Sequence, residues 1–296
     1  MFQNVLVGVD GRQGGRDAIA LAMRLLDRDA RLTLVNVHSG RLHPSSVLDP
    51  TLARDEREIS LELLEHERDD AEVTAELVGV EALSAGGGLH LQAERLGADL
   101  LVVGSCSHGA LGRAMLGDDT RAALNGAPCA VAIAPRGYAQ QPVPLARIGV
   151  AYNGSPESEL ALQTARRLAS ESNASIHALE VVTIPSYAYS GAITPVAGES
   201  IELMLREASD AMRLLPGVEG RAVYGLPGEE LASFGDQLDL LVVGSRSYGP
   251  VKRLVLGSTS DYLERHARCA LLVLPRTARS AQPSEHAHAA AAASGS

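Results

Sequence analysis

The stretch GSRSYGPVKRLVLGSTS, residues 244–260, connects the apolar run LDLLVV to a segment that reads as the start of a helix. Glycines and hydroxyl side chains between a strand and a helix start are typical of loops that hold an anion. The stretch GSCSHGALGRAMLGDDT, residues 104–120, has the same frame 140 positions earlier. It differs by two aspartates, Asp118 and Asp119, where the later stretch has serine and threonine.

The similarity extends along the whole chain. At the same offset Asp99 matches Asp239 and Pro135 matches Pro275 without a gap. The segments NVLVGVDG and RIGVAYNG, which begin the two halves, also match, at a slightly larger offset. Self-similarity over such a length indicates a duplicated domain.

The repeat sets the expected domain boundaries. We expect one domain at residues 1–135 and a second at 147–276. The polar, proline-bearing segment RGYAQQPVPLA, 136–146, is typical of a linker. Residues 277–296 are rich in alanine, serine and histidine, so we expect a disordered tail.

Strand and helix patterns alternate within each half. The first half shows, in order, strands and helices at about 4–10, 16–29, 31–37, 51–70, 72–80, 88–96, 99–103, 118–125 and 129–134. The second half repeats this order. Such alternation predicts right-handed crossovers and a mainly parallel sheet with helices on both faces. We therefore expect two tandem, doubly wound α/β domains.

Composition narrows the functional classes. The net charge of −10 and the lack of tryptophan disfavour nucleic-acid binding, since an acidic surface repels the phosphate backbone. No uninterrupted apolar run is long enough to predict a membrane span. The first strand pattern starts at Asn4, which leaves no room for a secretion signal, and three cysteines do not form a disulfide framework. We expect a cytoplasmic protein.

Two loops in each half fall at the carboxyl ends of parallel strands, where open α/β sheets bind ligands. In the second half one loop follows the first strand and the other begins at Gly244. Ser245 and Ser247 add hydroxyl groups, and Gly257 precedes a helix whose first N–H groups lack partners. Unpaired N–H groups, hydroxyls and the helix dipole predict a phosphate site.

The spacing Gly244-x-x-Ser247, nine residues, then Gly257-Ser258 resembles the nucleotide-binding signature of universal stress proteins. That signature reads glycine, two residues, glycine, nine residues, then glycine followed by serine or threonine. The resemblance covers both halves, so the chain is similar to a tandem universal stress protein of the ATP-binding subgroup. It implies five-stranded parallel sheets of the adenine nucleotide alpha hydrolase-like type, with ATP, alone or with Mg²⁺, across the strand ends. It also implies pairing through the last strands, within the chain or in a homodimer.

The resemblance also implies which residues line each site. For the second site these are Ala151, Asn153, Val181, Val243, Gly244, Arg246, Ser247, Gly257, Ser258, Thr259 and Ser260. For the first site they are Gly8, Asp10, Val37, Val103, Gly104, Ser107, Gly117, Asp118, Asp119 and Thr120. Two positions depart from the family pattern: serine replaces the middle glycine in both halves, and Asn153 replaces an acid.

Asp118 has two readings. As an N-cap it accepts the free N–H groups of the first helical turn. As a built-in anion it repels phosphate, by about 1 kcal/mol in water and about 4 kcal/mol near a protein surface at 4 Å. A bridging magnesium ion would reverse this effect. We therefore expect the C-terminal domain to hold the stronger ATP site.

Other reactive side chains have weaker support. Cys129 and Cys269 begin equivalent strands and are expected to pack in the core. A redox role for Cys106 would require a lowered pKa. Lys252 and Arg253, like Arg246, either contact phosphate or are solvated surface charges. No spacing predicts a metal site, and no nucleophile or general base for catalysis is recognisable.

The leading hypothesis is an ATP-binding regulatory or stress-response protein with protein partners that the sequence does not name. A first alternative is an enzyme that cleaves ATP slowly or adenylates a substrate, which product formation with magnesium would reveal. A second is a scaffold that has lost nucleotide binding and keeps only its pairing surface.

Overall fold

The computed structural model describes residues 1–39, 50–105, 118–142, 144–183, 195–245, 254 and 257–275. The expected tail, 277–296, lies outside this part of the chain. Where helices are described, no helix is both long and apolar enough to cross a membrane.

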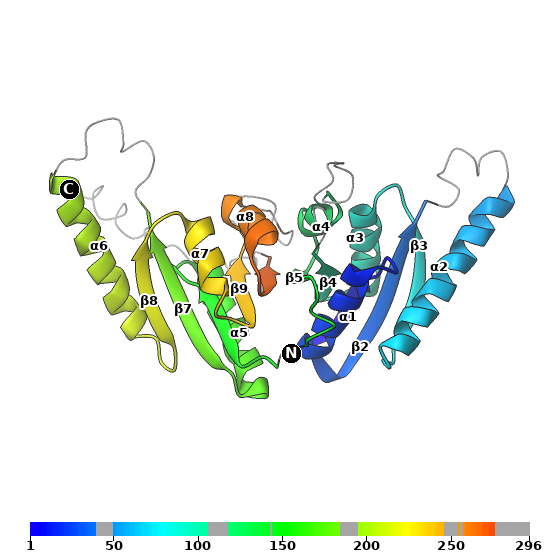
Figure 1. Ribbon diagram of the computed structural model, residues 1–296, viewed down its shortest axis with the longest axis horizontal. Helices are drawn as coiled ribbons and strands as arrows, with labels where there is room; N and C mark the ends of the chain where they lie inside the picture. The colour runs from blue at the N-terminus through cyan, green and yellow to red at the C-terminus, as the bar shows by residue number, and fades with distance from the viewer. Residues whose placement is uncertain are drawn as a thin grey trace, which may run out of the picture.

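Each half alternates strands with helices in the predicted order (Figure 1). The first half consists of β1 (Phe2–Gly8), α1 (Gln13–Leu25), β2 (Leu26–His38), α2 (Pro50–Asp70), β3 (Glu76–Glu81), α3 (Ala85–Leu96), β4 (Leu100–Gly104), α4 (Asp118–Leu124) and β5 (Ala130–Ala134). The second consists of β6 (Arg147–Ala151), α5 (Pro156–Ser172), β7 (Ser175–Val182), α6 (Pro195–Arg213), β8 (Glu219–Tyr224), α7 (Pro227–Gly235), β9 (Leu240–Gly244), α8 (Ser258–His266) and β10 (Ala270–Leu274).

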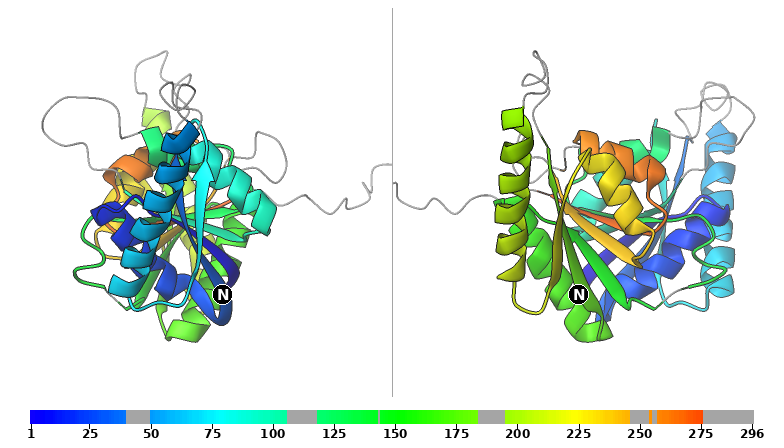
Figure 2. Two further views of the ribbon diagram at one scale, coloured as in Figure 1. Left: turned by 90° about the vertical axis from the view of Figure 1, so that its right-hand side faces the viewer. Right: turned by 60° about the vertical axis from the view of Figure 1, so that its left-hand side comes forward.

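The two halves share one ten-stranded sheet, in the order β3-β2-β1-β4-β5-β10-β9-β6-β7-β8. Within each half neighbouring strands are parallel, as predicted. At the centre β5 and β10 pair antiparallel, with Leu272 opposite Ala132. Helices cover both faces of this twisted sheet (Figure 2). The expected pairing of last strands therefore occurs inside one chain.

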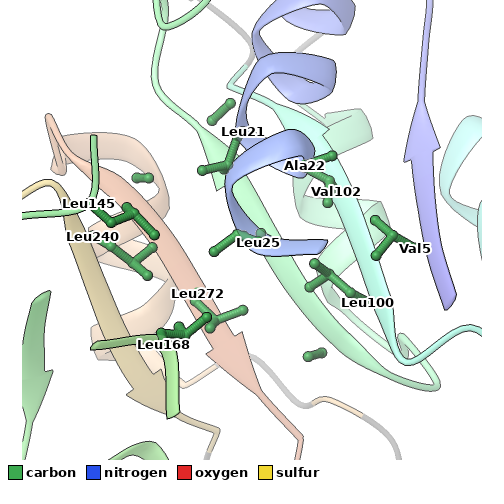
Figure 3. Close-up of a cluster of buried hydrophobic side chains, with 14 of the residues drawn as sticks. Val5, Leu21, Ala22, Leu25, Leu100, Val102, Leu145, Leu168, Leu240 and Leu272 are labelled. Atoms are coloured by element: carbon green, nitrogen blue, oxygen red, sulfur yellow. The ribbon is translucent and has the colours of Figure 1, made fainter. Parts of the chain in front are cut away.

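One apolar cluster lies on each face of the sheet, because successive strand residues point to opposite faces. On one face Val5, Leu100 and Leu272 pack against α1 and α5. On the other face the neighbouring residues of the same strands pack against α3, α4, α7 and α8. Both clusters contain residues of both halves, as the first does in Figure 3. The domains thus share their cores.

Polar contacts also join the halves near the centre of the sheet. The backbone N–H of Leu254 donates to Ala127 O at 2.9 Å, and the N–H of Gly126 donates to Leu254 O at 2.9 Å. Arg121 of α4 forms an ion pair with Asp261 of α8 at 3.2 Å. Leu254, which follows β9 in the chain, is therefore held by the opposite half.

The repeated aspartate before the DLLVV strands aligns the neighbouring strand in each half. Asp99 accepts hydrogen bonds from the backbone N–H groups of Gln3 (2.8 Å) and Asn4 (3.0 Å). Asp239 accepts them from the corresponding start of β6, at residues 146 and 147. The duplicated motif thus has a structural function that the sequence analysis did not assign.

The segment between the halves packs against the first domain. Asp17 on α1, 1% exposed, accepts hydrogen bonds from the N–H groups of Gly137 and Ala139, both at 2.8 Å. Tyr138 between them and Leu145 further along are buried in the shared core. This segment therefore lies in a fixed position on α1.

The predicted end of the first helix was wrong. The helix expected to reach residue 29 ends at Leu25, and β2 begins at once at Leu26. Leu26 pairs with Phe2, ahead of an irregularity in the register. The Asp27 side chain accepts a hydrogen bond from Gln3 Nε2 at 2.7 Å, so this charged segment extends the sheet.

Cys129 and Cys269 are buried in the same cluster, 5% and 8% exposed. Burial raises the pKa of each thiol to about 12. Because the thiolate is the reactive form, we expect neither cysteine to react with iodoacetamide at pH 8 in the folded protein. Mass spectrometry should find both alkylated after unfolding in guanidinium. Labelling of either one without denaturant would contradict this.

Candidate functional site

A cavity of about 470 Å³ lies at the carboxyl ends of the strands in the second half. Strands β6, β7 and β9 and helices α5, α7 and α8 contribute to its wall. Eight of the residues predicted from the sequence line it: Ala151, Asn153, Val181, Val243, Gly244, Gly257, Thr259 and Ser260. Ser258 is exposed at the start of α8 and does not line it, while Arg246 and Ser247 lie outside the described residues.

The cavity has an apolar part and a polar part. Leu179, Val181 and Leu231 provide apolar surface that suits a flat ring. At the other part Gly244 and Gly257 bring two backbone segments together. Helix α8 starts there without a side-chain cap on its first N–H groups. The combination can accept a base at one end and an anion at the other.

Ser245 is a lining residue that the site prediction left out. It is 4% exposed, and its Oγ has no hydrogen-bond partner among the described residues. A buried hydroxyl without a partner is costly, so such a group usually indicates an absent ligand or water. Its neighbours in the sequence gave the signal, since two serines follow Gly244.

The loop after the first strand has the same geometry in both halves. Asp10 Oδ1 accepts a hydrogen bond from the N–H of Arg12 at 3.0 Å. Asn153 Oδ1 accepts one from the N–H of Ser155 at 3.2 Å. The glycine between them, at 11 and 154, has φ of +71° and +72°, a conformation that glycine adopts without strain. Asparagine in place of aspartate therefore preserves the loop conformation. It replaces only the second carboxylate oxygen, an acceptor, by an NH2 group, a donor.

Two ionisable side chains of the second half, Glu157 and Tyr152, also line the cavity. Glu157 lines it and is the one charged lining residue in the part of this half that is described. Tyr152 also lines it and donates its hydroxyl proton to Glu159. This hydrogen bond raises the pKa of Tyr152 to about 12, so the phenol stays neutral.

A matching cavity of about 320 Å³ lies in the first half. Six predicted residues line it: Gly8, Asp10, Val37, Val103, Gly104 and Thr120. Thr120 Oγ1 donates to Gly104 O at 3.1 Å and joins the start of α4 to the end of β4. Ser107 and Gly117 lie outside the described residues, as do the side chains of Asp118 and Asp119.

The first cavity also has lining residues that the site prediction missed. They include Arg12, Gln13, Gly14 and Asp17 from the loop and first turns of α1, and Arg136 from the segment after β5. Sequence spacing gave no signal for Arg136, because the sequence placed it in the linker. Only packing of that segment on α1 brings it to the cavity.

The described residues of the two cavities form no ready-made metal site. Within the described residues no group of three or more His, Cys, Asp or Glu side chains could hold a metal ion. A magnesium ion at such a site would depend on ligand phosphates, as magnesium sites commonly do.

Comparison with solved structures supports the fold. A universal stress protein from Archaeoglobus fulgidus superposes with a TM-score of 0.60 over 92% of this chain and 98% of that chain, at 16% sequence identity. A putative universal stress protein from Pseudomonas aeruginosa gives a TM-score of 0.57 over 92% and 93%, at 17% identity. At these identities the likeness concerns the fold.

Sequence comparison finds relatives with the same family name. A universal stress protein of Mycobacterium tuberculosis is 32% identical over 183 residues, 60% of this chain and 61% of the relative. One from Thermus aquaticus is 30% identical over 132 residues, 42% of this chain and 95% of that protein. The chain thus spans about three-fifths of the length of the mycobacterial relative that it matches.

The family model described as "Universal stress protein family" matches residues 1–135 and again 145–275. The two matches cover both halves of the ten-stranded sheet, all lining residues of the second cavity and all those of the first except Arg136. This chain belongs to the universal stress protein family.

Proposed function

We propose that this chain is a cytoplasmic, ATP-binding regulatory protein of stress responses, with the C-terminal cavity as its stronger nucleotide site. The observation that carries the proposal is the buried Oγ of Ser245, which has no partner among the described residues and lines the cavity beside the uncapped start of α8. A phosphate would accept a hydrogen bond from this hydroxyl and would lie at the positive end of the α8 dipole.

The two ends of the cavity match the two ends of ATP. The apolar wall of Leu179, Val181 and Leu231 would cover the adenine ring. Gly244 lets the end of β9 approach the backbone of α5 at Glu157, so that the strand end and the helix start both border the polar part. Because Glu157 is acidic, Mg²⁺ bound to the phosphates would reduce its repulsion.

The proposed activity is binding without dedicated turnover. A regulatory protein of this kind acts by shifting the population of its states, which requires different ATP affinities in those states. Incubation with ATP and magnesium for hours should therefore leave the nucleotide intact, and ADP or an adenylated product would favour the enzyme alternative. The pairing of β5 with β10 occupies both last strands, so the proposal needs no second copy of the chain.

The charge at the start of α8 provides a direct test. Ser258→Asp with Thr259→Asp copies the residues of the first half and places one carboxylate in the cavity lining, at position 259, and a second next to it at the start of α8. We expect ATP affinity at the C-terminal site to fall at least about tenfold, because each like charge costs about 1–4 kcal/mol at close range. Calorimetric titration of the full chain, with and without magnesium, measures this.

A matched control adds the same charge elsewhere. Gln163 and Gln237 are exposed and line neither cavity. Gln163→Glu with Gln237→Glu should leave ATP affinity within about twofold, because screening weakens distant exposed charges. Equal losses in both variants, or no ATP binding by the unmodified protein, would refute the proposal.

A further inference from the structure

Two cationic side chains line the N-terminal cavity, whereas the charged side chain in the described lining of the C-terminal cavity is Glu157. Arg12 and Arg136 line the first cavity. When the loops after the first strands are matched, Arg12 corresponds to Ser155, and the open position Gly14 corresponds to Glu157. The counterpart of Arg136, Arg276, lies outside the described residues.

Neither of these guanidinium groups is engaged by another side chain that the structure describes. Arg12 and Arg136 are both exposed, and no hydrogen bond or ion pair joins either guanidinium to the described part of the protein. Arg16, one turn along α1, provides the contrast, because its Nε lies 3.0 Å from the carboxylate of Glu67. The charges of Arg12 and Arg136 are therefore available to a ligand.

The two acidic residues in the described lining of the same cavity, Asp10 and Asp17, are bonded to other groups. Asp17 accepts hydrogen bonds from the N–H groups of Gly137 and Ala139 and from Gln13 Nε2 at 2.9 Å. Asp10 accepts one from the backbone N–H of Arg12. Both carboxylates thus hold backbone in place and form no ion pair with the two arginines.

The same contacts fix where Arg136 lies. The amides of Gly137 and Ala139 bind Asp17, and Tyr138 between them is 5% exposed in the shared core. Arg136 directly precedes this anchored segment, and the N–H of Tyr138 donates to Pro135 O at 3.2 Å. The segment between the domains therefore delivers a positive charge to the first cavity.

A guanidinium presents a planar fork of donors that matches phosphate oxygens. We propose that Arg12 and Arg136 bind the phosphate groups of a nucleotide in the N-terminal cavity. This cavity would then hold phosphate from the side of α1 and the interdomain segment. The inference rests on the proposed function, since it takes an adenine nucleotide as the ligand, and it adds a different phosphate contact in each half.

The test isolates the first cavity in the full chain. In the background Ser258→Asp with Thr259→Asp, which weakens the second site, Arg12→Gln with Arg136→Gln should lower ATP affinity about tenfold or more. Adenosine has no phosphate, so its affinity should not change. The control Arg57→Gln with Arg95→Gln removes two exposed charges that line neither cavity and should change ATP affinity less than twofold. Titration calorimetry without magnesium gives all three values.

Each of the following outcomes would contradict the inference. Unchanged ATP affinity after loss of both arginines would overturn the inference and leave ATP binding at the C-terminal cavity intact. An equal loss for adenosine would also overturn it, because the arginines would then act through packing. A background that binds no ATP, while the unmodified protein binds one, would show that the first cavity is not a nucleotide site. If the unmodified protein binds no ATP, the proposed function fails and the inference fails with it.

Discussion

Leu272→Asp is expected to lower the free energy of unfolding of the whole chain by about 4 kcal/mol. Leu272 is 0% exposed and lies on β10 between Ala132 of β5 and Val242 of β9. A carboxylate there would be buried without a partner. Because its cluster contains residues of both halves, both should lose stability together. Thermal unfolding by calorimetry should show one transition, shifted to lower temperature.

An exposed leucine is the control for this change. Leu203 on α6 is 58% exposed, so Leu203→Asp should alter the unfolding free energy by no more than about 0.5 kcal/mol. Hydrogen exchange adds a regional measurement. Leu272→Asp should increase exchange in β1 and β4 as well as in β9. Two separate transitions, with that of the first half unchanged, would show that the halves are independent.

Gly104→Ala is expected to destabilise the protein by about 3 kcal/mol and to reduce ligand binding in the N-terminal cavity. A Cβ at Gly104 would lie 2.2 Å from the carbonyl oxygen of Gly14 and 2.5 Å from its carbonyl carbon. These are backbone atoms, so β4 and the start of α1 would have to separate. Both glycines line the cavity, and the separation would change its shape. Denaturant unfolding and ATP titration measure the two effects.

Gly14→Ala changes the other side of the same contact. The nearest atoms to a Cβ at Gly14 are 3.8 Å away, an ordinary contact distance. Alanine is also favoured over glycine in a helix, so we expect neutrality or a gain of about 0.5 kcal/mol. If the two alanine variants were equally destabilised, close backbone approach could not be the reason for glycine at position 104.

The sequence predicted most of the fold because the signals were local and repeated. Alternating apolar strands and amphipathic helices indicated a parallel sheet in each half, and the structure confirms this. The extent of β2 was not predicted, because residues 27–29 are charged and carry no strand pattern. Their place in the sheet depends on β1 beside them, with Leu26 opposite Phe2.

The positions of the two loops at the strand ends could also be predicted from the sequence, but only part of each cavity lining could. Spacing around Gly104 and Gly244 placed the loops at strand ends, and the structure brings many of the predicted residues together there. Arg136 could not be found in this way, since its approach to the first cavity depends on hydrogen bonds to Asp17. The missing partner of the Ser245 hydroxyl also appears only in three dimensions, because burial is a property of the packed chain.

The sequence by itself determined the duplication, the α/β architecture and the glycine-rich loops, because each is written in residues close together in the chain. Only the tertiary structure decided that the last strands pair with each other in one chain. An apolar edge strand requires a partner but does not specify which. Here both apolar clusters are built from residues of both halves, and β10 pairs with β5 of the same chain. The tertiary structure likewise decided the charges in each cavity, since those side chains come from segments that meet only after folding.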